Sequence, residues 1–171
     1  GAQSLEAYVE WGTASGAYPN ARPAALFQAR TAIDLSIDGL TADTAYFYRV
    51  RYRAPGSASF SAGDEHRFRT ARRAGQSFSF AVQADPHLDE NSSPTVYAQT
   101  LANILADQPD FMVDLGDASM ADKCAVQGDV LCGRRNPATN DPIFARNLLQ
   151  RSYFERVAHS VPLFMALGNH E

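Results

Sequence analysis

Three short apolar runs in the second half of the chain each lead into residues of the kinds that bind metal ions. The runs span residues 78–82, 111–115 and 163–167. Short apolar runs of this kind are typical of parallel strands buried on both faces of a sheet. They are followed, in order, by Asp85-Pro86-His87, Gly116-Asp117 and Gly168-Asn169-His170-Glu171. Because ligands bind beyond the carboxyl ends of parallel strands, we expect these side chains to converge on one or two metal ions.

Helix signals lie between the apolar runs. Ser93 and Pro94 form a typical N-cap and first-turn proline, and Pro109 ends the helix that they begin. The apolar residues in between fall on one helical face. Apolar residues from Phe144 to Val157 indicate a second helix before the third run. The strand–helix–strand order predicts an α/β unit with a right-handed crossover.

Residues 1–72 have a different pattern, in which apolar and polar side chains alternate. Ile33, Leu35 and Ile37 alternate with polar residues, and aromatic or apolar residues alternate mostly with arginines over residues 46–53. This period of two predicts strands with one buried side and one solvent-facing side. A polar linker follows at residues 71–76. We therefore expect an all-β domain over residues 1–72 and an α/β domain over residues 73–171.

Each motif taken alone has a simpler interpretation. An aspartate and a histidine spaced like Asp85 and His87 are usually part of a surface turn. Gly116-Asp117 fits a sharp turn or a helix cap, and Asn169-His170 fits a buried polar pair or a helix start. Three such motifs in this order, each after a strand, favour a metal site. A carboxylate with an imidazole suits Zn²⁺, Mn²⁺ or iron.

The motifs D-x-H, G-D and G-N-H-E, in this order, resemble the signature of the calcineurin-like metallophosphoesterases. The stretch from Leu40 to Tyr46, with the alternation after it, resembles the tyrosine-corner strand of a fibronectin type III sandwich. Strands of that kind before the signature make the chain similar to purple-acid-phosphatase-like enzymes. The resemblance implies a partial fibronectin III-like β-sandwich, then α/β, the first half of a four-layer α/β/β/α metallophosphoesterase domain. We expect the chain to be truncated at both ends.

The resemblance implies a metal-binding role for each motif. Asp85 and His87 would hold the first metal ion, and Asp117 would bridge two ions. Asn169 would bind the second ion through its amide oxygen. His170 would lie just outside the metals, over the phosphate. The implied cofactors are two divalent or trivalent ions of iron, zinc or manganese.

The resemblance also implies a reaction. A hydroxide bound to the dinuclear centre would attack the phosphate ester, and His170 would donate a hydrogen bond or proton to the phosphate or the leaving oxygen. Glu171 would orient His170, and Asp114 would support the ligands from behind. The implied activity is hydrolysis of phosphate monoesters. A phosphodiesterase or nucleotidase of the same superfamily, and a non-catalytic extracellular binding protein on this scaffold, are the alternatives.

Two departures from the purple enzymes change the expected chemistry. His87 stands where those enzymes carry glycine, and Met120 stands where they carry the tyrosine three positions after the second aspartate. We therefore expect no tyrosinate–iron chromophore. The three further histidine ligands of the family would come after the last residue of this sequence. We expect residues 1–171 alone to bind at most one metal ion weakly and to lack useful phosphatase activity.

Charge and cysteine content bear on partners and location. The formal net charge of −4 argues against a nucleic-acid partner, and no apolar run is long enough for a transmembrane helix. Cys124 and Cys132 lie eight positions apart in a polar, loop-like stretch. Two free thiols or a metal pair would also fit, but we expect a local disulfide that stabilises the fold by ~2–3 kcal/mol. That bond would point to a secreted or periplasmic protein, and the sequence leaves the oligomeric state open.

Overall fold

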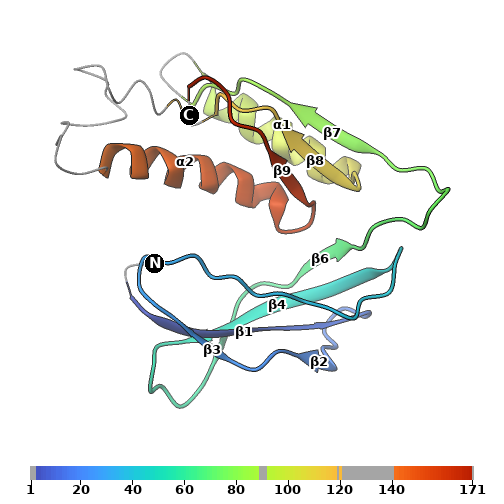
Figure 1. Cartoon of the computed structure of the whole chain (residues 1–171), viewed down its shortest axis with the longest axis vertical. Helices are drawn as coiled ribbons and strands as arrows, with labels where there is room; N and C mark the ends of the chain where they lie inside the picture. The colour runs from blue at the N-terminus through green and yellow to red at the C-terminus, as the bar shows by residue number, and fades with distance from the viewer. Residues whose placement is uncertain (1–2, 89–91, 119, 121–140, 171) are drawn as a thin grey trace. The chain divides into compact units, whose positions relative to one another are not determined.

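A computed structural model of the chain describes residues 3–88, 92–118, 120 and 141–170, without the side chains of residues 141–143 (Figure 1). The chain divides into two compact units, Gly1–Gln76 and Ser77–Glu171. The division falls at the end of the polar linker of residues 71–76. Cys124, Cys132 and Glu171 lie outside the described residues, so the expected disulfide and the expected role of Glu171 stay predictions.

The first unit is built on one antiparallel sheet. Its two long strands, β1 (Leu5–Gly12) and β4 (Ala45–Arg53), pair in a register that sets Val9 opposite Val50. Four shorter strands complete the sheet along these two: β2 (Asn20–Ala21), β3 (Ala25–Phe27), β5 (Ser61–Ala62) and β6 (His66–Arg69). The all-β expectation for this unit therefore agrees with its secondary structure, while the two-sheet fibronectin-like sandwich stays a prediction.

The core of the first unit lies on one face of this sheet. Val9, Trp11 and Tyr46 are buried there, as the period-two pattern requires. The Tyr46 hydroxyl accepts a hydrogen bond from the backbone amide of Thr41, five residues upstream, at 3.0 Å. The hydroxyl of this buried tyrosine therefore holds the turn that leads into β4.

The strand expected around Ile33 and Ile37 is absent from the structure. Residues 32–38 have no strand pairing, although Leu35 and Ile37 do pack against the core of the sheet. The carbonyl of Ser36 accepts a hydrogen bond from the Arg22 side chain at 2.9 Å. The alternating apolar side chains therefore pack onto the core from an irregular segment. That segment lacks the backbone pairing that defines a strand.

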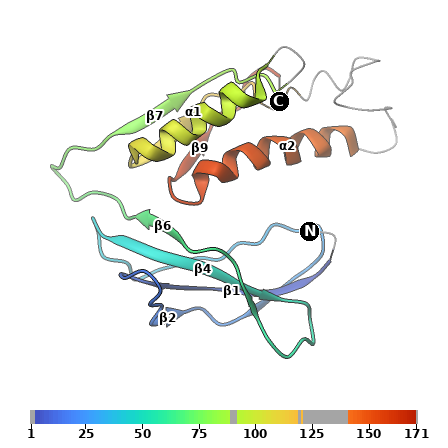
Figure 2. The ribbon, with the colours of Figure 1, turned by 180° about the vertical axis from the view of Figure 1, so that it is seen from behind.

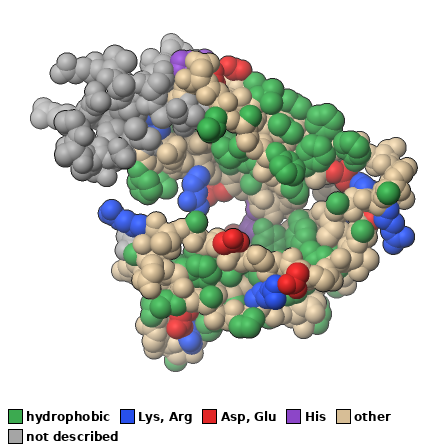
Figure 3. Space-filling model, in the orientation of Figure 1, with side chains coloured by type: hydrophobic (Ala, Val, Ile, Leu, Met, Phe, Trp, Pro, Cys, Tyr) green, Lys and Arg blue, Asp and Glu red, His purple; other side chains and the backbone are tan. Residues whose placement is uncertain are grey.

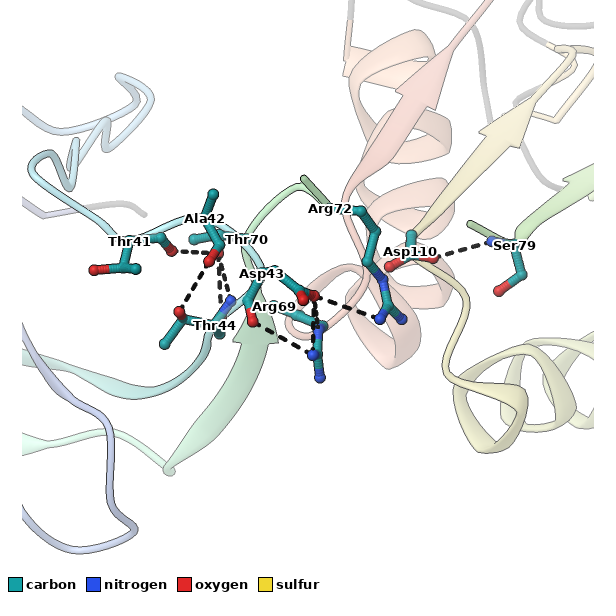
Figure 4. A network of polar contacts seen from close by, with 9 residues as sticks. All are labelled: Thr41, Ala42, Asp43, Thr44, Arg69, Thr70, Arg72, Ser79 and Asp110. Atoms are coloured by element: carbon teal, nitrogen blue, oxygen red, sulfur yellow. Dashed lines mark hydrogen bonds and ion pairs between the residues drawn. The ribbon is translucent and has the colours of Figure 1, made fainter. Parts of the chain in front are cut away.

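Several arginines of the first unit form ion pairs. Arg49 and Arg51 both reach Glu10 across the β1–β4 pair, and Arg53 reaches Glu6. The carboxylate of Asp43 lies 2.9 Å from the Arg69 guanidinium and 3.4 Å from that of Arg72, and Figure 4 shows the two arginines beside it. Ion pairs at a protein surface stabilise a fold by only about 0–1 kcal/mol each. They offset the charge of the arginines that they involve.

The second unit is a parallel α/β arrangement. Three strands form one sheet in the order β7 (Phe80–Gln83), β8 (Phe111–Asp114) and β9 (Leu163–Met165). Helix α1 (Pro94–Asp107) joins the first two strands, and α2 (Asp141–Ala158) precedes the third. The mixed α/β class with two helices is therefore confirmed. Where the strands begin, the Ser79 amide donates to the Asp110 carboxylate at 3.0 Å (Figure 4).

Local signals define the ends of α1. The Ser93 hydroxyl accepts from the amide of Val96 at 3.4 Å, and Pro94 occupies the first turn. At the other end Gln108 adopts a left-handed conformation, with φ of 49°, just before Pro109. The cap and stop that the sequence predicts are both present, because proline cannot continue the helix and disfavours helical backbone before it.

The two helices cover one face of the parallel sheet. Figure 2 shows them side by side in front of the strands, and Leu101, Met112 and Val157 are fully buried between the two layers. The opposite face was expected to be buried too, but Phe80, Val82 and Phe164 are 53%, 53% and 60% exposed. Figure 3 shows hydrophobic side chains gathered over these strands. Among the described residues of the second unit, this face therefore stays about half exposed.

Within residues 3–88, 92–118, 120 and 141–170, no helix is both long and apolar enough to span a membrane.

Candidate metal centre

Three predicted ligands meet beyond the carboxyl ends of β7 and β8. Asp85 and His87 follow β7, and Asp117 follows β8. One possible ligand atom from each lies within 4.8 Å of the other two. His87 Nε2 is 3.5 Å from Asp85 Oδ1. The structure therefore brings two carboxylates and one imidazole to a single point.

Backbone pairing holds the two ligand loops side by side. Past the end of β7, the amide of Asp85 donates to the Gly116 carbonyl at 3.1 Å. The amide of His87 then donates to the Asp117 carbonyl, also at 3.1 Å. These bonds extend the β7–β8 pairing beyond the strands themselves. The spacing between the two motifs is thus set by main-chain atoms.

Left-handed backbone is concentrated at this site. Asp85, His87, Asp117 and Met120 have φ of 53°, 43°, 56° and 53°. Such values are uncommon for residues other than glycine, cost about 1–3 kcal/mol each, and cluster at functional sites. The local backbone turns sharply at each ligand, and the rest of the α/β unit must hold it in that conformation.

Two glycines allow the loop after β9 to approach the loop after β8. Gly116 has φ of 93°, and a Cβ on it would lie 2.2 Å from the amide nitrogen of Gly168. A Cβ on Gly168 would lie 2.0 Å from Asp117 Oδ1. Neither position has room for a side chain, so the glycines in both motifs are explained by the contact between the loops.

The third motif lies against the Asp117 carboxylate. The backbone amide of His170 donates to Asp117 Oδ1 at 3.0 Å. The His170 ring stands edge-on to the His87 ring, with 5.7 Å between centroids and 68° between planes. Asn169 is exposed and lies between two residues that both contact Asp117. His170 is therefore placed beside the cluster of possible ligands.

The chemistry of the cluster fits a metal ion. His87 Nε2 is buried and has no hydrogen-bond partner among the described residues, even though it faces Asp85. A buried polar atom left in this state costs about 1–3 kcal/mol, and the lone pair of a neutral imidazole is a common metal ligand. The Asp85 side chain is 64% exposed, so the site opens to solvent on that side. Mixed carboxylate and imidazole donors suit zinc, manganese or iron.

A buried polar network lies directly behind the ligand loops. Asp114 is fully buried, and its Oδ1 accepts from the Gly116 amide at 3.0 Å. Its other carboxylate oxygen accepts from Gln83 Nε2, which also donates to the Tyr97 hydroxyl at 2.8 Å. Burial raises the pKa of Tyr97 to about 12, so this hydroxyl stays protonated at neutral pH. Asp114 was expected to support the ligands, whereas Gln83 and Tyr97 were missed.

Gln83 and Arg146, which the sequence analysis missed, differ in whether the sequence carried a signal for them. Gln83 is a polar residue that continues an apolar run and stands two positions before Asp85, which is a usable signal. Arg146 gave no such signal. It is 1% exposed on α2, and its Nη1 donates to the Leu88 carbonyl at 3.3 Å, next to His87. It ties α2 to the end of the first ligand loop.

Each of the three motifs thus contributes at least one residue to the same small region. Asp85 and His87 come from the first motif, Asp117 from the second and His170 from the third. No protein-family model matches this chain, and no curated protein matches it either.

Proposed function

We propose that this chain carries the metal-binding part of a phosphoesterase that hydrolyses phosphate monoesters. The observation that carries the proposal is the convergence of Asp85, His87 and Asp117 within 4.8 Å. Two carboxylates and an imidazole at the ends of adjacent parallel strands are a suitable donor set for a hydrolytic metal site. The order of the three motifs, which resembles that of the calcineurin-like metallophosphoesterases, supports the same reaction class.

Each residue has a defined part in this proposal. Asp85, His87 and Asp117 would hold one ion, and Asp117 and Asn169 would contribute to a second. When bound, such ions supply positive charge that activates water and stabilises the charge developing on a phosphate ester. His170 stands beside Asp117 and His87, where its ring can donate a hydrogen bond to a phosphate oxygen. Substrate reaches the site from the exposed side of Asp85.

The architecture and location that we propose follow the same resemblance. The hydrogen bond from the Thr41 amide to the Tyr46 hydroxyl supports a fibronectin-like tyrosine corner in the first unit. The exposed apolar face of the β7–β8–β9 sheet supports a further layer of structure over it, because parallel sheets are normally covered on both faces. A secreted or periplasmic location rests on the expected Cys124–Cys132 disulfide.

A direct test uses the full-length protein with p-nitrophenyl phosphate and with bis-p-nitrophenyl phosphate. Chelation should abolish hydrolysis, and Mn²⁺ or Zn²⁺ should restore it, with the monoester turned over faster. Faster turnover of the diester would assign the phosphodiesterase activity instead. A folded, metal-replete protein that hydrolyses neither ester would contradict the proposal and favour a binding role.

The metal-loaded protein should not be purple. Met120, which is 1% exposed and three positions after Asp117, has no oxygen to offer an iron ion. A metal-replete preparation should therefore lack an intense visible charge-transfer band, as measured by absorption spectroscopy alongside metal analysis. An intense purple colour would show that a tyrosine from elsewhere in the chain binds the ion.

A further inference from the structure

The buried network behind the ligand loops begins on a helix and ends at the backbone between two ligands. Tyr97 belongs to α1, Gln83 is the last residue of β7, and Asp114 is the last residue of β8. Gln83 and Asp114 are direct partners in the register of the two strands. The side-chain amide of Gln83 bonds to both Tyr97 and Asp114.

We propose that Gln83 is a positioning residue of the metal centre, acting through Asp114 and Gly116 on the carboxylates of Asp85 and Asp117. The proposal rests on the metal-binding part of the function proposed above. Gln83 itself touches neither substrate nor metal in this account. Its contribution is to fix the orientation of the Asp114 carboxylate, which in turn accepts a hydrogen bond from the Gly116 amide.

The backbone of Gly116 is the point where this network reaches the ligands. Its amide nitrogen donates to Asp114 Oδ1 at 3.0 Å, and its carbonyl accepts from the Asp85 amide at 3.1 Å. Asp117 is the next residue in the chain. A rotation of Asp114 would therefore displace the backbone of Gly116, which is hydrogen-bonded to Asp85 through its carbonyl and covalently joined to Asp117.

The orientation of the Gln83 amide is determined by its partners. Nε2 faces both the Asp114 carboxylate and the Tyr97 hydroxyl, while Oε1 is buried without a hydrogen-bond partner among the described residues. The reversed amide would point Oε1 at a carboxylate oxygen, and two acceptors repel each other. The amide is therefore held in one orientation, in which it links Tyr97 of α1 to Asp114.

Glutamine has the hydrogen-bonding groups that this position requires. The site needs a neutral donor with two N–H groups that reaches both a carboxylate and a hydroxyl from one strand position. Methionine has the same length and an unbranched shape but no N–H. Gln83→Met therefore removes the two hydrogen bonds while it preserves most of the packing under the sheet.

The test compares the metal affinity of full-length wild-type protein, Gln83→Met, Tyr97→Phe and Tyr153→Phe by calorimetry with Mn²⁺ and with Zn²⁺. Changes to groups that orient metal ligands typically weaken affinity by about 10–100-fold. We expect a weakening in that range for Gln83→Met and a smaller one for Tyr97→Phe. Tyr153→Phe is the matched control, because its ring lies 4.9 Å from the Tyr97 ring but its hydroxyl is outside the network.

A second measurement separates positioning from general stability. In the metal-free proteins, hydrogen exchange of the Gly116 amide should accelerate in Gln83→Met, while exchange across the rest of α1 and β8 stays as in wild type. The Co²⁺-loaded variant should also show altered d–d absorption, which reports ligand geometry. Loss of thermal stability with unchanged affinity, unchanged Gly116 exchange and an unchanged Co²⁺ spectrum would overturn the proposal.

Failure of the proposed function has a different signature. A wild-type protein that binds metal but hydrolyses no phosphate ester would refute the phosphoesterase activity, and the affinity comparison would still support or overturn the role of Gln83. A wild-type protein that binds neither Mn²⁺ nor Zn²⁺ would overturn both.

Discussion

Asp117→Asn should leave the full-length protein folded and lower its turnover of p-nitrophenyl phosphate by on the order of 10³-fold. Asparagine keeps an oxygen that can accept from the His170 amide, a bond now 3.0 Å long, but it loses the negative charge. Metal ions contribute several kcal/mol of charge stabilisation to such reactions, and each ~1.4 kcal/mol corresponds to a tenfold change in rate. Steady-state kinetics at saturating Mn²⁺, with calorimetry for metal binding, provide the measurement.

The matched control for this variant is Asp107→Asn. It makes the same change of charge at an exposed position at the end of α1, away from the ligand loops. Its turnover should equal that of wild type. If folded Asp117→Asn protein turned over substrate at the wild-type rate, the carboxylate would have no part in holding metal and the proposed centre would be wrong.

Gly168→Ala should weaken metal binding strongly, although it replaces no ligand. The added Cβ would lie 2.0 Å from Asp117 Oδ1 and 2.5 Å from the Asp117 amide nitrogen, far inside contact distance. The Asp117 carboxylate and the third loop cannot both keep their positions. We expect metal affinity to fall by at least about 100-fold, the upper end of effects from residues that orient ligands.

The control for Gly168→Ala is Gly63→Ala in the first unit. Gly63, like Gly168, has no positive φ, and a Cβ on it would meet only the Val50 carbonyl, at 3.3 Å. That variant should bind metal like wild type. Calorimetry and circular dichroism on both variants give the comparison. Wild-type affinity in folded Gly168→Ala protein would mean that the loop after β9 does not press on Asp117 when metal is bound.

Local sequence signals were reliable for parts of the fold that depend on neighbouring residues. Ser93 and Pro94 begin α1, and Pro109 follows its end, as their side-chain and ring chemistry requires. Apolar runs also located the three parallel strands. Since the ends of parallel strands share one edge of a sheet, this was enough to predict that Asp85, His87 and Asp117 would meet.

Other features depend on contacts between residues far apart in the chain, and the sequence pattern was misleading or silent there. The alternation at Ile33, Leu35 and Ile37 predicted a strand, but these residues form an irregular segment. Gln83 bonds to residues 14 and 31 positions away, and Arg146 bonds to a carbonyl 58 positions away. No local pattern encodes such pairs, because each partner is an ordinary residue in its own segment.

The sequence by itself determined which residues could act as ligands and which strand end each would follow. Residue type and the periodicity of side chains are properties of short segments, so they can be read directly. Only the tertiary structure decided that Gly116 and Gly168 press together, that a buried Gln83–Asp114 pair lies behind the ligands, and that one face of the parallel sheet stays exposed among the described residues. These features depend on how closely separate segments pack, and packing distance is a property of the folded chain as a whole.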